Sequence, residues 1–439
     1  MVAVAHSLER EVLGAIAGRR SEIIDLATAL IAFDTTARGP QDPPRDERAL
    51  QEFLAERLAR AGAEVEMWEP DAAAIGGERQ VPPGLSFDGR PQLAARLRGA
   101  GGGRSLLFNG HIDVVSPEPV ERWTSDPWCA EVRGGKLYGR GSCDMKGGLA
   151  AMVTAAEILA ELGVPLAGDL IVNTNTDEES SGAGSLACAA HGIAADAGIC
   201  PEGTGGALWL ACRGTASVTI TVPGRSGHVE VRQPDWRDGG PVNAIDKAEL
   251  VLSVIRELRR RWSQRADQQH SFLAPGSATT TVVDGGEWFV SYPAACRLIV
   301  NISYLPTSAD HDGYGAAVAA ELERAVLEVT DADEWLRGHP PTFEWGPDLP
   351  PFEVDASHPI VGTLTDAAAA AGGNPRLGFT DSWFDAASFV RAGAATVIGY
   401  GPRANNAHGV DEHVAVDELV SCTQTLALSA MRWCGVEQS

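Results

Sequence analysis

Short apolar segments that end in His, Asp or Glu recur along this chain, and they constrain its fold more than any other feature of the sequence. They alternate with helical patterns over residues 105–200, and the alternation resumes near residue 358. Strands that alternate with helices form parallel βαβ units. We therefore expect an α/β fold with a mixed, mostly parallel sheet.

Five of these segments deliver a polar side chain at or soon after their carboxyl ends. In chain order the set is His111 and Asp113, then Asp144, then Asp177-Glu178-Glu179, then Glu202, and finally His408. Ligands of open α/β sheets bind at the carboxyl edge of the strands. We expect these side chains to meet at that edge.

Asp144 lies in a glycine-rich run, residues 139–148. A strand-like segment, 135–138, precedes this run, and an apolar helical pattern, 149–162, follows it. Glycine lets a backbone approach a ligand closely. The sequence therefore predicts that Asp144 lies on a tight turn at a helix start, where its carboxylate is well placed to hold a cation.

The candidate ligands are imidazoles and carboxylates without a thiolate, a set that suits zinc, manganese or cobalt. One metal would need only three protein ligands, whereas this chain offers five candidates. A shared carboxylate among terminal ligands is typical of two-metal hydrolytic sites, whose metals lie about 3.5–4 Å apart. We expect two divalent metal ions.

The pattern changes at Gly214, where a strand of alternating polarity begins. From there the expected order is β-α-β-β-α-β, with strands at 216–222, 279–283, 297–305 and 342–345 and helices at 241–262 and 314–329. That order is typical of a ferredoxin-like unit. We predict that residues 213–350 form an inserted domain and that residues 1–212 and 351–439 form one discontinuous domain.

Outside the insertion, helical spacing is found at residues 7–33, 47–61, 358–371, 382–392 and 416–433. Residues 70–92 are polar and rich in Gly and Pro, which predicts an excursion over the surface.

Composition limits the partners and the location. A net charge of −24 argues against binding to nucleic acid or to an anionic membrane. No stretch approaches the roughly 20 apolar residues of a membrane span, and residues 1–20 have no signal-peptide core. The eight cysteines form no C-x-x-C pair, which predicts reduced thiols in a cytoplasmic protein.

Taken together, the five strand-end motifs and the inserted unit resemble the M20 metallopeptidase family, which includes acetylornithine deacetylases, succinyl-diaminopimelate desuccinylases, aminoacylases and glutamate carboxypeptidases. The resemblance spans nearly the whole chain. It implies a zinc-peptidase-like catalytic domain and makes the inserted unit a lid and dimerisation domain.

The resemblance also implies a role for each motif. His111 and Glu202 are ligands of the first metal, Glu179 and His408 are ligands of the second, and Asp144 bridges both. Asp113 orients the imidazole of His111, and Glu178 is the general base. Zinc is the metal we expect, with cobalt and manganese as alternatives.

In the inserted domain, Gly224-Arg225-Ser226-Gly227-His228 is similar to the family's G-x-x-G-H motif. The likeness implies that His228 stabilises the oxyanion in the active site of a partner subunit, and hence a homodimer formed through the lid. Asn243 matches a position that lines the substrate pocket. Asp381 matches one near the metals, with a helix cap as the alternative. Glu412 is interpreted only as complementing the start of the final helix.

The chain departs from the family pattern on the third strand of the insertion, where Asn301 and Ser303 replace an Asp-x-Arg. In relatives that Arg grips the α-carboxylate of the substrate, and an Arg clamp is not easily replaced. Arg225, Arg232 and Arg376 are the residues that would compensate.

We therefore predict a deacylase that hydrolyses the amide bond of a small N-acylated amine or amino acid. A dipeptidase or carboxypeptidase on the same scaffold is the alternative. A non-catalytic binding protein is a further one, disfavoured because Glu178 and all five ligand candidates are present.

Overall fold

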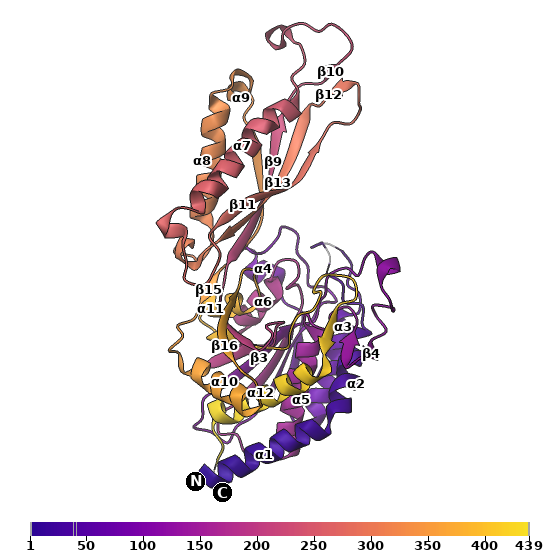
Figure 1. The fold of residues 1–439 in the computed structure, drawn as a ribbon, viewed down its shortest axis with the longest axis vertical. Helices are drawn as coiled ribbons and strands as arrows, with labels where there is room; N and C mark the ends of the chain where they lie inside the picture. Colours follow the sequence, from indigo (N-terminus) through magenta and orange to yellow (C-terminus); the bar gives the residue numbers. More distant parts are fainter. Residues whose placement is uncertain (1, 38, 41, 438–439) are drawn as a thin grey trace. The chain divides into compact units, whose positions relative to one another are not determined.

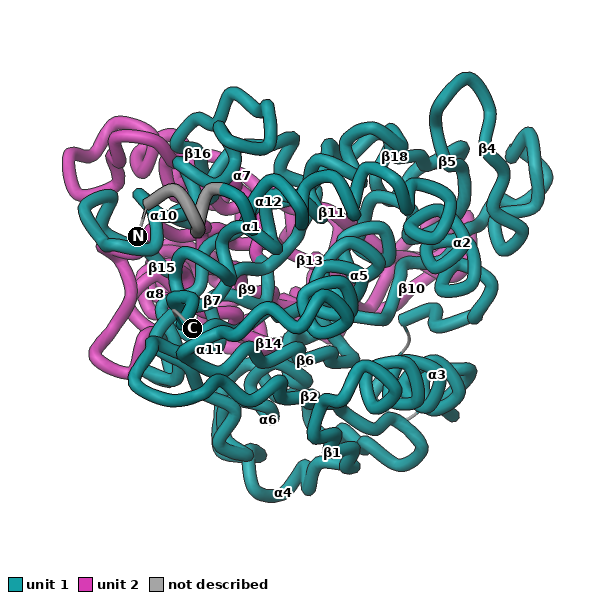
Figure 2. Tube along the Cα trace, turned by 90° about the horizontal axis from the view of Figure 1, so that it is seen from below, with its two compact units in different colours: residues 1–211, 352–379, 384–439 teal, residues 212–351, 380–383 magenta. Residues whose placement is uncertain are grey.

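A computed structural model describes residues 2–37, 39–40 and 42–437, and its contacts divide the chain into two compact units (Figure 2). Unit 1 comprises residues 1–211, 352–379 and 384–439, and unit 2 comprises residues 212–351 and 380–383. Three separate stretches of chain thus build unit 1.

Unit 1 is built on a nine-stranded sheet with the order β1-β2-β6-β3-β7-β17-β8-β15, in which β16 pairs with β8. Its strands are β1 (Glu64–Trp68), β2 (Gln92–Leu97), β3 (Leu106–His111), β6 (Leu170–Asn175), β7 (Ala197–Cys200), β8 (Ala207–Cys212), β15 (Phe352–Glu353), β16 (Arg376–Thr380) and β17 (Val397–Gly399). The neighbours β6, β3, β7 and β17 are parallel, whereas β1, β2 and β8 pair antiparallel. The predicted α/β fold with a mixed sheet is confirmed. The sheet is parallel only at its centre, however, so the expectation that it is mostly parallel is wrong.

Helices cover both faces of this sheet, with α5 and α12 on one face and α6 and α11 on the other (Figure 1). The helices of unit 1 are α1 (Val2–Gly18), α2 (Arg20–Ile31), α3 (Glu47–Arg60), α4 (Ala72–Ile75), α5 (Lys146–Glu161), α6 (Ala183–His191), α10 (Pro359–Ala370), α11 (Ala386–Arg391) and α12 (Val416–Cys434). Helix α5 is buried on nearly all sides through its first three turns, which is why its sequence is apolar without a polar stripe.

A separate three-stranded sheet has the order β18-β5-β4 and is formed by β4 (Glu131–Arg133), β5 (Lys136–Tyr138) and β18 (His413–Ala415). It joins the chain just before Asp144 to the chain just after His408, because His413 is the partner of Tyr138.

The stretch of residues 70–92 lies at the surface of unit 1, as predicted, with Asp71, Gly77 and Asp88 exposed, but a few buried side chains anchor it. Ile75, Leu85 and Phe87 are buried against α6 in a hydrophobic cluster of their own. Gln80 is fully buried, and its amide nitrogen donates to the carbonyl oxygen of Gly182 at 2.8 Å. The largest apolar side chains of this polar stretch face inward, which composition alone does not reveal, whereas Ala73 and Ala74 are exposed.

Unit 2 is a four-stranded antiparallel sheet with the order β11-β13-β9-β14. Its elements are β9 (Gly214–Pro223), β10 (Gly227–His228), α7 (Ala244–Trp262), β11 (Ser277–Gly285), β12 (Ser291–Tyr292), β13 (Ala295–Tyr304), α8 (Ala316–Asp331), α9 (Glu334–Gly338) and β14 (Thr342–Leu349). The β9-α7-β11-β13-α8-β14 order is the predicted one, and the two long helices pack against each other. Strands β10 and β12 form a short ladder beside it.

No helix in the described part of the chain is both long and apolar enough to cross a membrane. All eight cysteines are free thiols, as the sequence predicts.

Candidate metal centre

Four of the five candidate motifs follow central strands of the unit 1 sheet. His111 ends β3, residues 177–179 follow β6, Glu202 follows β7, and His408 lies in the loop after β17. Since these strands are parallel neighbours, their carboxyl ends lie at one edge of the sheet. The topology therefore brings these side chains together.

Asp144 reaches the same place by a different route from the one predicted. The strand before it, β5, belongs to the small β18-β5-β4 sheet, so Asp144 is positioned by the start of α5. Close packing of that helix requires Gly148, where an added Cβ would lie 2.0 Å from the carbonyl oxygen of Pro201. This contact brings the start of α5 against the loop that carries Glu202.

The carboxylate of Asp144 faces two groups of side chains at once. Its Oδ1 lies 3.3 Å from His111 Nε2, and its Oδ2 lies 3.2 Å from His408 Nε2. His111 Nε2 is also 3.6 Å from Glu202 Oε1, and His408 Nε2 is 3.1 Å from Glu179 Oε2. His111, Asp144 and Glu202 form one set, and Asp144, Glu179 and His408 form another, each with its ligand atoms within 4.8 Å of one another.

This donor set fits two divalent cations. Glu202 and His111 are buried, and the buried Glu179 Oε1 has no hydrogen-bond partner. A buried carboxylate is costly unless it is paired or bound to a metal. His111 Nδ1 lies 2.8 Å from the backbone oxygen of Asp113. Because a carbonyl only accepts, Nδ1 carries the proton and Nε2 is free to bind a cation.

Burial and mutual repulsion perturb the pKa values of the cluster. Burial raises the pKa of Glu202 to about 8 and holds that of Glu178 well above its ordinary value. Hydrogen bonds to Asp144 and Glu179 raise the pKa of His408 to about 10. Burial opposes ionisation of Asp144, but hydrogen bonds from the two histidines outweigh it and lower its pKa. Without cations the cluster thus retains protons, which bound metal ions would displace.

A pH dependence of stability follows for the metal-free protein. Folding raises the pKa of the Glu202 carboxyl from 4.5 to about 8 and the pKa of His408 from 6.5 to about 10. The folded state therefore binds more protons than the unfolded state near neutrality. The stability that these two groups contribute to the folded state is lost as the pH rises. We expect the Tm of chelator-treated protein to fall by about 2 °C or more between pH 6 and 8, a fall that calorimetry would measure.

Lys146 has the opposite effect on stability. Burial lowers its pKa to about 7, so the stability that it contributes to the folded state grows only above that pH. Glu202→Gln is the control and should reduce the change in Tm between pH 6 and 8. A Tm that stays constant or rises from pH 6 to 8 would contradict the proton-retaining cluster.

Asp113 acts differently from what the resemblance implies. Its backbone oxygen, not its carboxylate, accepts from His111, since the nearer carboxylate oxygen is 3.7 Å from Nδ1. The carboxylate instead accepts the backbone N–H groups of Glu178 and Glu179 at 3.2 and 3.0 Å. Asp113 therefore ties the strand end of His111 to the turn that carries both glutamates.

The turn that carries Glu178 and Glu179 allows these two neighbouring side chains to point into the site together. Asp177 has a φ of 70°, which ends β6 sharply, and residues 178–181 form a turn. Glu179 contacts His408, while Glu178 Oε2 lies 3.9 Å from His111 Nε2. The two carboxylates thus contact different histidines of the site from successive positions of one turn.

A buried aspartate that the sequence did not single out lies behind Glu178. Asp385 is fully buried at the N-terminus of α11, and it accepts from Asn175 Nδ2 at 2.7 Å. Burial raises its pKa to about 6, and its charge adds to the raised pKa of Glu178. The helix predicted for residues 382–392 places Asp385 within a helix, so no signal in the sequence marks this aspartate.

Asp381 lies in unit 2, where it accepts from the backbone N–H of Ala274 at 3.0 Å and pairs with Arg213 at 3.3 Å. The helix-cap alternative is wrong, because α11 begins at Ala386. The interpretation of Glu412 is also wrong. This side chain does not complement α12 but is fully buried, with Arg140 and the backbone of Cys143 as partners.

The other two predicted residues of the insertion lie in unit 2. Asn243 caps α7 by accepting from Ile245 N at 3.0 Å, and its amide nitrogen donates to Asp246. His228 is exposed on β10, where its Nδ1 accepts from Glu230 N at 3.2 Å. Roles for His228, Asn243 and Asp381 in catalysis or substrate binding remain predictions.

This chain is similar in sequence to known amide hydrolases. The chain is 30% identical over 442 residues to N-formyl-4-amino-5-aminomethyl-2-methylpyrimidine deformylase of Bacillus subtilis. The match covers 94% of this chain and 95% of that protein. It is 30% identical over 410 residues to succinyl-diaminopimelate desuccinylase of Gluconacetobacter diazotrophicus, with coverage of 87% and 96%.

Among solved structures, the Bacillus subtilis YXEP protein, described as a dinuclear metal binding peptidase from the M20 family, matches with a TM-score of 0.62. The identity is 14%, and the match covers 94% of this chain and 98% of that one. A model of peptidase family M20/M25/M40 matches residues 107–432. That match spans most of the sequence and both units, and it confirms the resemblance: the chain belongs to peptidase family M20/M25/M40.

Proposed function

We propose that this protein is a two-metal-dependent amidohydrolase that releases a small acyl group from an N-acylated amine. The observation that carries the proposal is the carboxylate of Asp144, whose two oxygens face His111 and His408 separately. His111 and Glu202 would hold one cation, Glu179 and His408 the other, and Asp144 both. Imidazole and carboxylate ligands support zinc, with cobalt and manganese as alternatives.

Two bound divalent cations supply Lewis acidity, which lowers the pKa of a water and polarises an amide carbonyl. Glu178 is the group placed to move the proton. It faces the cluster without belonging to either set of ligands, so its carboxylate stays available to take a proton from the attacking water. It then passes that proton to the nitrogen of the leaving amine.

The substrate class follows from the relatives and from the missing clamp. A deformylase and a desuccinylase, as their names state, remove small acyl groups. On β13 the side chain of Asn301 donates to Thr215 Oγ1 at 3.1 Å. Arg225, one of the arginines that would compensate, donates to the carbonyl oxygens of Trp236 and Gly240 and is thus committed within unit 2. We propose an amine substrate that needs no α-carboxylate.

A substrate panel tests this proposal. N-formyl, N-acetyl and N-succinyl derivatives of aromatic amines and of amino acids would be compared with dipeptides, using zinc-loaded protein. The proposal predicts the highest kcat/KM for an N-acyl amine that lacks an α-carboxylate. Preference for dipeptides would favour the peptidase alternative, and no turnover of any amide would favour a binding protein.

We further propose that unit 2 is the lid and dimerisation domain of a homodimer. Its strand β11 lies at the edge of the sheet, and that strand and the loop after it expose large apolar side chains. They are Val282, Val283, Trp288 and Phe289, with exposed fractions of 37%, 56%, 63% and 85%. An exposed apolar edge of this kind favours pairing with another chain.

The free thiols support a cytoplasmic location.

If His228 serves the site of the partner subunit, two inactive variants should restore each other. Unfolded His228→Ala and Glu178→Ala chains, refolded together, should form mixed dimers in which one site has both groups. Random mixing then gives about a quarter of the wild-type activity. The measurement is kcat of the refolded mixture against each variant refolded alone.

Activity of the mixture no higher than the sum of the two variants would contradict a role of His228 across the dimer. Ser226→Ala with Glu178→Ala is the matched control and should give about half the wild-type activity, as expected for one unaffected chain in two.

A further inference from the structure

We propose that Arg140 and Glu412 are positioning residues that preassemble the second metal set, Asp144, Glu179 and His408. The pair belongs to neither set of ligands. This inference rests on the proposed function, because it assigns to the pair the task of holding ligands before a metal arrives.

Glu412 fixes the segment that carries Asp144. Its Oε1 accepts the backbone N–H of Cys143 at 2.9 Å and that of Asp144 at 3.3 Å. The backbone oxygen of Glu412 also accepts from Gly139 N at 3.1 Å. The turn at the start of α5 is therefore held from both its ends by one residue from the loop of His408.

Arg140 connects that turn to two other segments of the site. Its guanidinium pairs with Glu412 Oε2 and donates to the backbone oxygens of Ser116 and Gly409 at 3.2 Å each. Ser116 lies just after His111 and Asp113, and Gly409 is the neighbour of His408. The guanidinium fork thus reaches all three segments that carry His111, Asp144 and His408.

The loop of His408 needs such support more than the rest of the site. Asn406, His408 and Asp411 all have positive φ values, of 54°, 61° and 58°, which residues other than glycine seldom adopt. The side chain of His408 is 55% exposed, whereas that of His111 is 1% exposed. Packing holds His111 in place, but His408 has little packing and depends on the backbone beneath it.

The pair is isolated from solvent, since the side chains of Arg140 and Glu412 are 2% and 1% exposed. A buried ion pair adds little to stability compared with apolar residues of the same size, while the loss of one partner leaves an unpaired buried charge. A test must therefore replace both members at once. Glu412→Gln keeps an oxygen that accepts the N–H groups, and Arg140→Met removes the fork.

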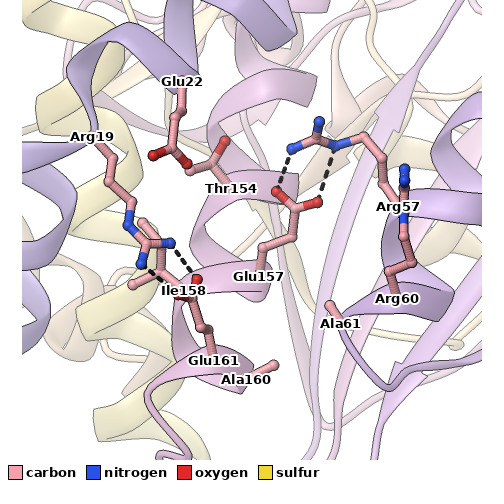
Figure 3. A pocket seen from close by; sticks show the side chains of 10 residues that line it. All are labelled: Arg19, Glu22, Arg57, Arg60, Ala61, Thr154, Glu157, Ile158, Ala160 and Glu161. Atoms are coloured by element: carbon pink, nitrogen blue, oxygen red, sulfur yellow. Dashed lines mark hydrogen bonds and ion pairs between the residues drawn. The ribbon is translucent and has the colours of Figure 1, made fainter.

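The experiment compares the double variant Arg140→Met/Glu412→Gln with wild type by calorimetric titration of chelator-treated protein with Zn²⁺. The matched control is Arg57→Met/Glu157→Gln. This ion pair of 2.7 Å joins α3 to α5 beside a cavity of about 550 Å³ that none of the proposed ligands lines (Figure 3).

We expect wild type and control to bind two Zn²⁺ ions. The double variant should bind one ion about 10–100-fold more weakly, as found for outer-shell partners of metal ligands, and the other with a clearly smaller loss of affinity, because Asp144 belongs to both sets. Its chelated form should keep the Tm of the chelated wild type to within a few degrees. Arg140→Lys, which keeps the charge but not the fork, should give an intermediate loss of Zn²⁺ affinity.

If the double variant bound both Zn²⁺ ions with the affinities of the wild type, this inference would be overturned and the proposed function would be left intact. Equal weakening of both Zn²⁺ ions together with a large drop in the chelated Tm would assign the pair a general structural role and also overturn it. Failure of the wild type to bind Zn²⁺ would overturn both the inference and the proposed function.

Discussion

Replacing Glu178 with alanine is expected to lower kcat by about 10²–10⁴-fold or more while the protein stays folded and keeps its metals. Glu178 faces His111 at 3.9 Å but belongs to neither set of ligands. Its backbone N–H, not its side chain, holds the turn to Asp113. Removing the carboxylate therefore deletes the proton acceptor and leaves the turn in place.

The measurement is kcat on the best N-acyl amine, with metal content determined on the same sample. Glu178→Gln should be as inactive as Glu178→Ala, because an amide keeps the shape but cannot take a proton. Glu121→Ala, at an exposed position outside the site, is the control. Turnover of Glu178→Ala close to that of wild type would remove the assignment of this residue as the base.

Asp144→Asn is expected to have the largest effect on metal binding. Both oxygens of Asp144 are engaged, one beside each histidine, so one substitution weakens both sets. The affinity for the more weakly held metal should fall by more than the roughly 10–100-fold that follows loss of an outer-shell contact. Turnover should then depend on excess metal in the assay.

Elemental analysis after dialysis would measure this as a loss of bound metal. Asp88→Asn, at an exposed aspartate, should retain the metal content of wild type. If Asp144→Asn kept both metals and full activity, Asp144 would not be the shared ligand, and the two sets would need another bridge.

Local pattern was sufficient to predict the parts of this site that lie on strands. An apolar run of three or four residues with His, Asp or Glu soon after it marks a strand end, and parallel pairing of β6, β3, β7 and β17 then brings those ends together. The inserted β-α-β-β-α-β unit was predictable for the same reason, since its periodicity changes from helix to strand at each boundary.

The residues that sequence reasoning missed act through contacts that leave no local trace. Glu412 and Arg140 are 272 positions apart, and Asp385 meets Asn175 across 210. Each is a charged residue near a turn or a helix start, where an exposed position is the ordinary interpretation. Asp113 was identified, but its carboxylate binds two backbone N–H groups that become available only when residues 178–179 form a turn.

The measurement that tests the central claim most directly is the metal content of the purified protein together with N-acyl amine hydrolysis before and after chelation. The account predicts about two divalent ions per chain, loss of turnover on chelation, and recovery when zinc, cobalt or manganese is added back. A protein that binds no metal under these conditions, or that hydrolyses the amide equally well after complete chelation, would contradict it.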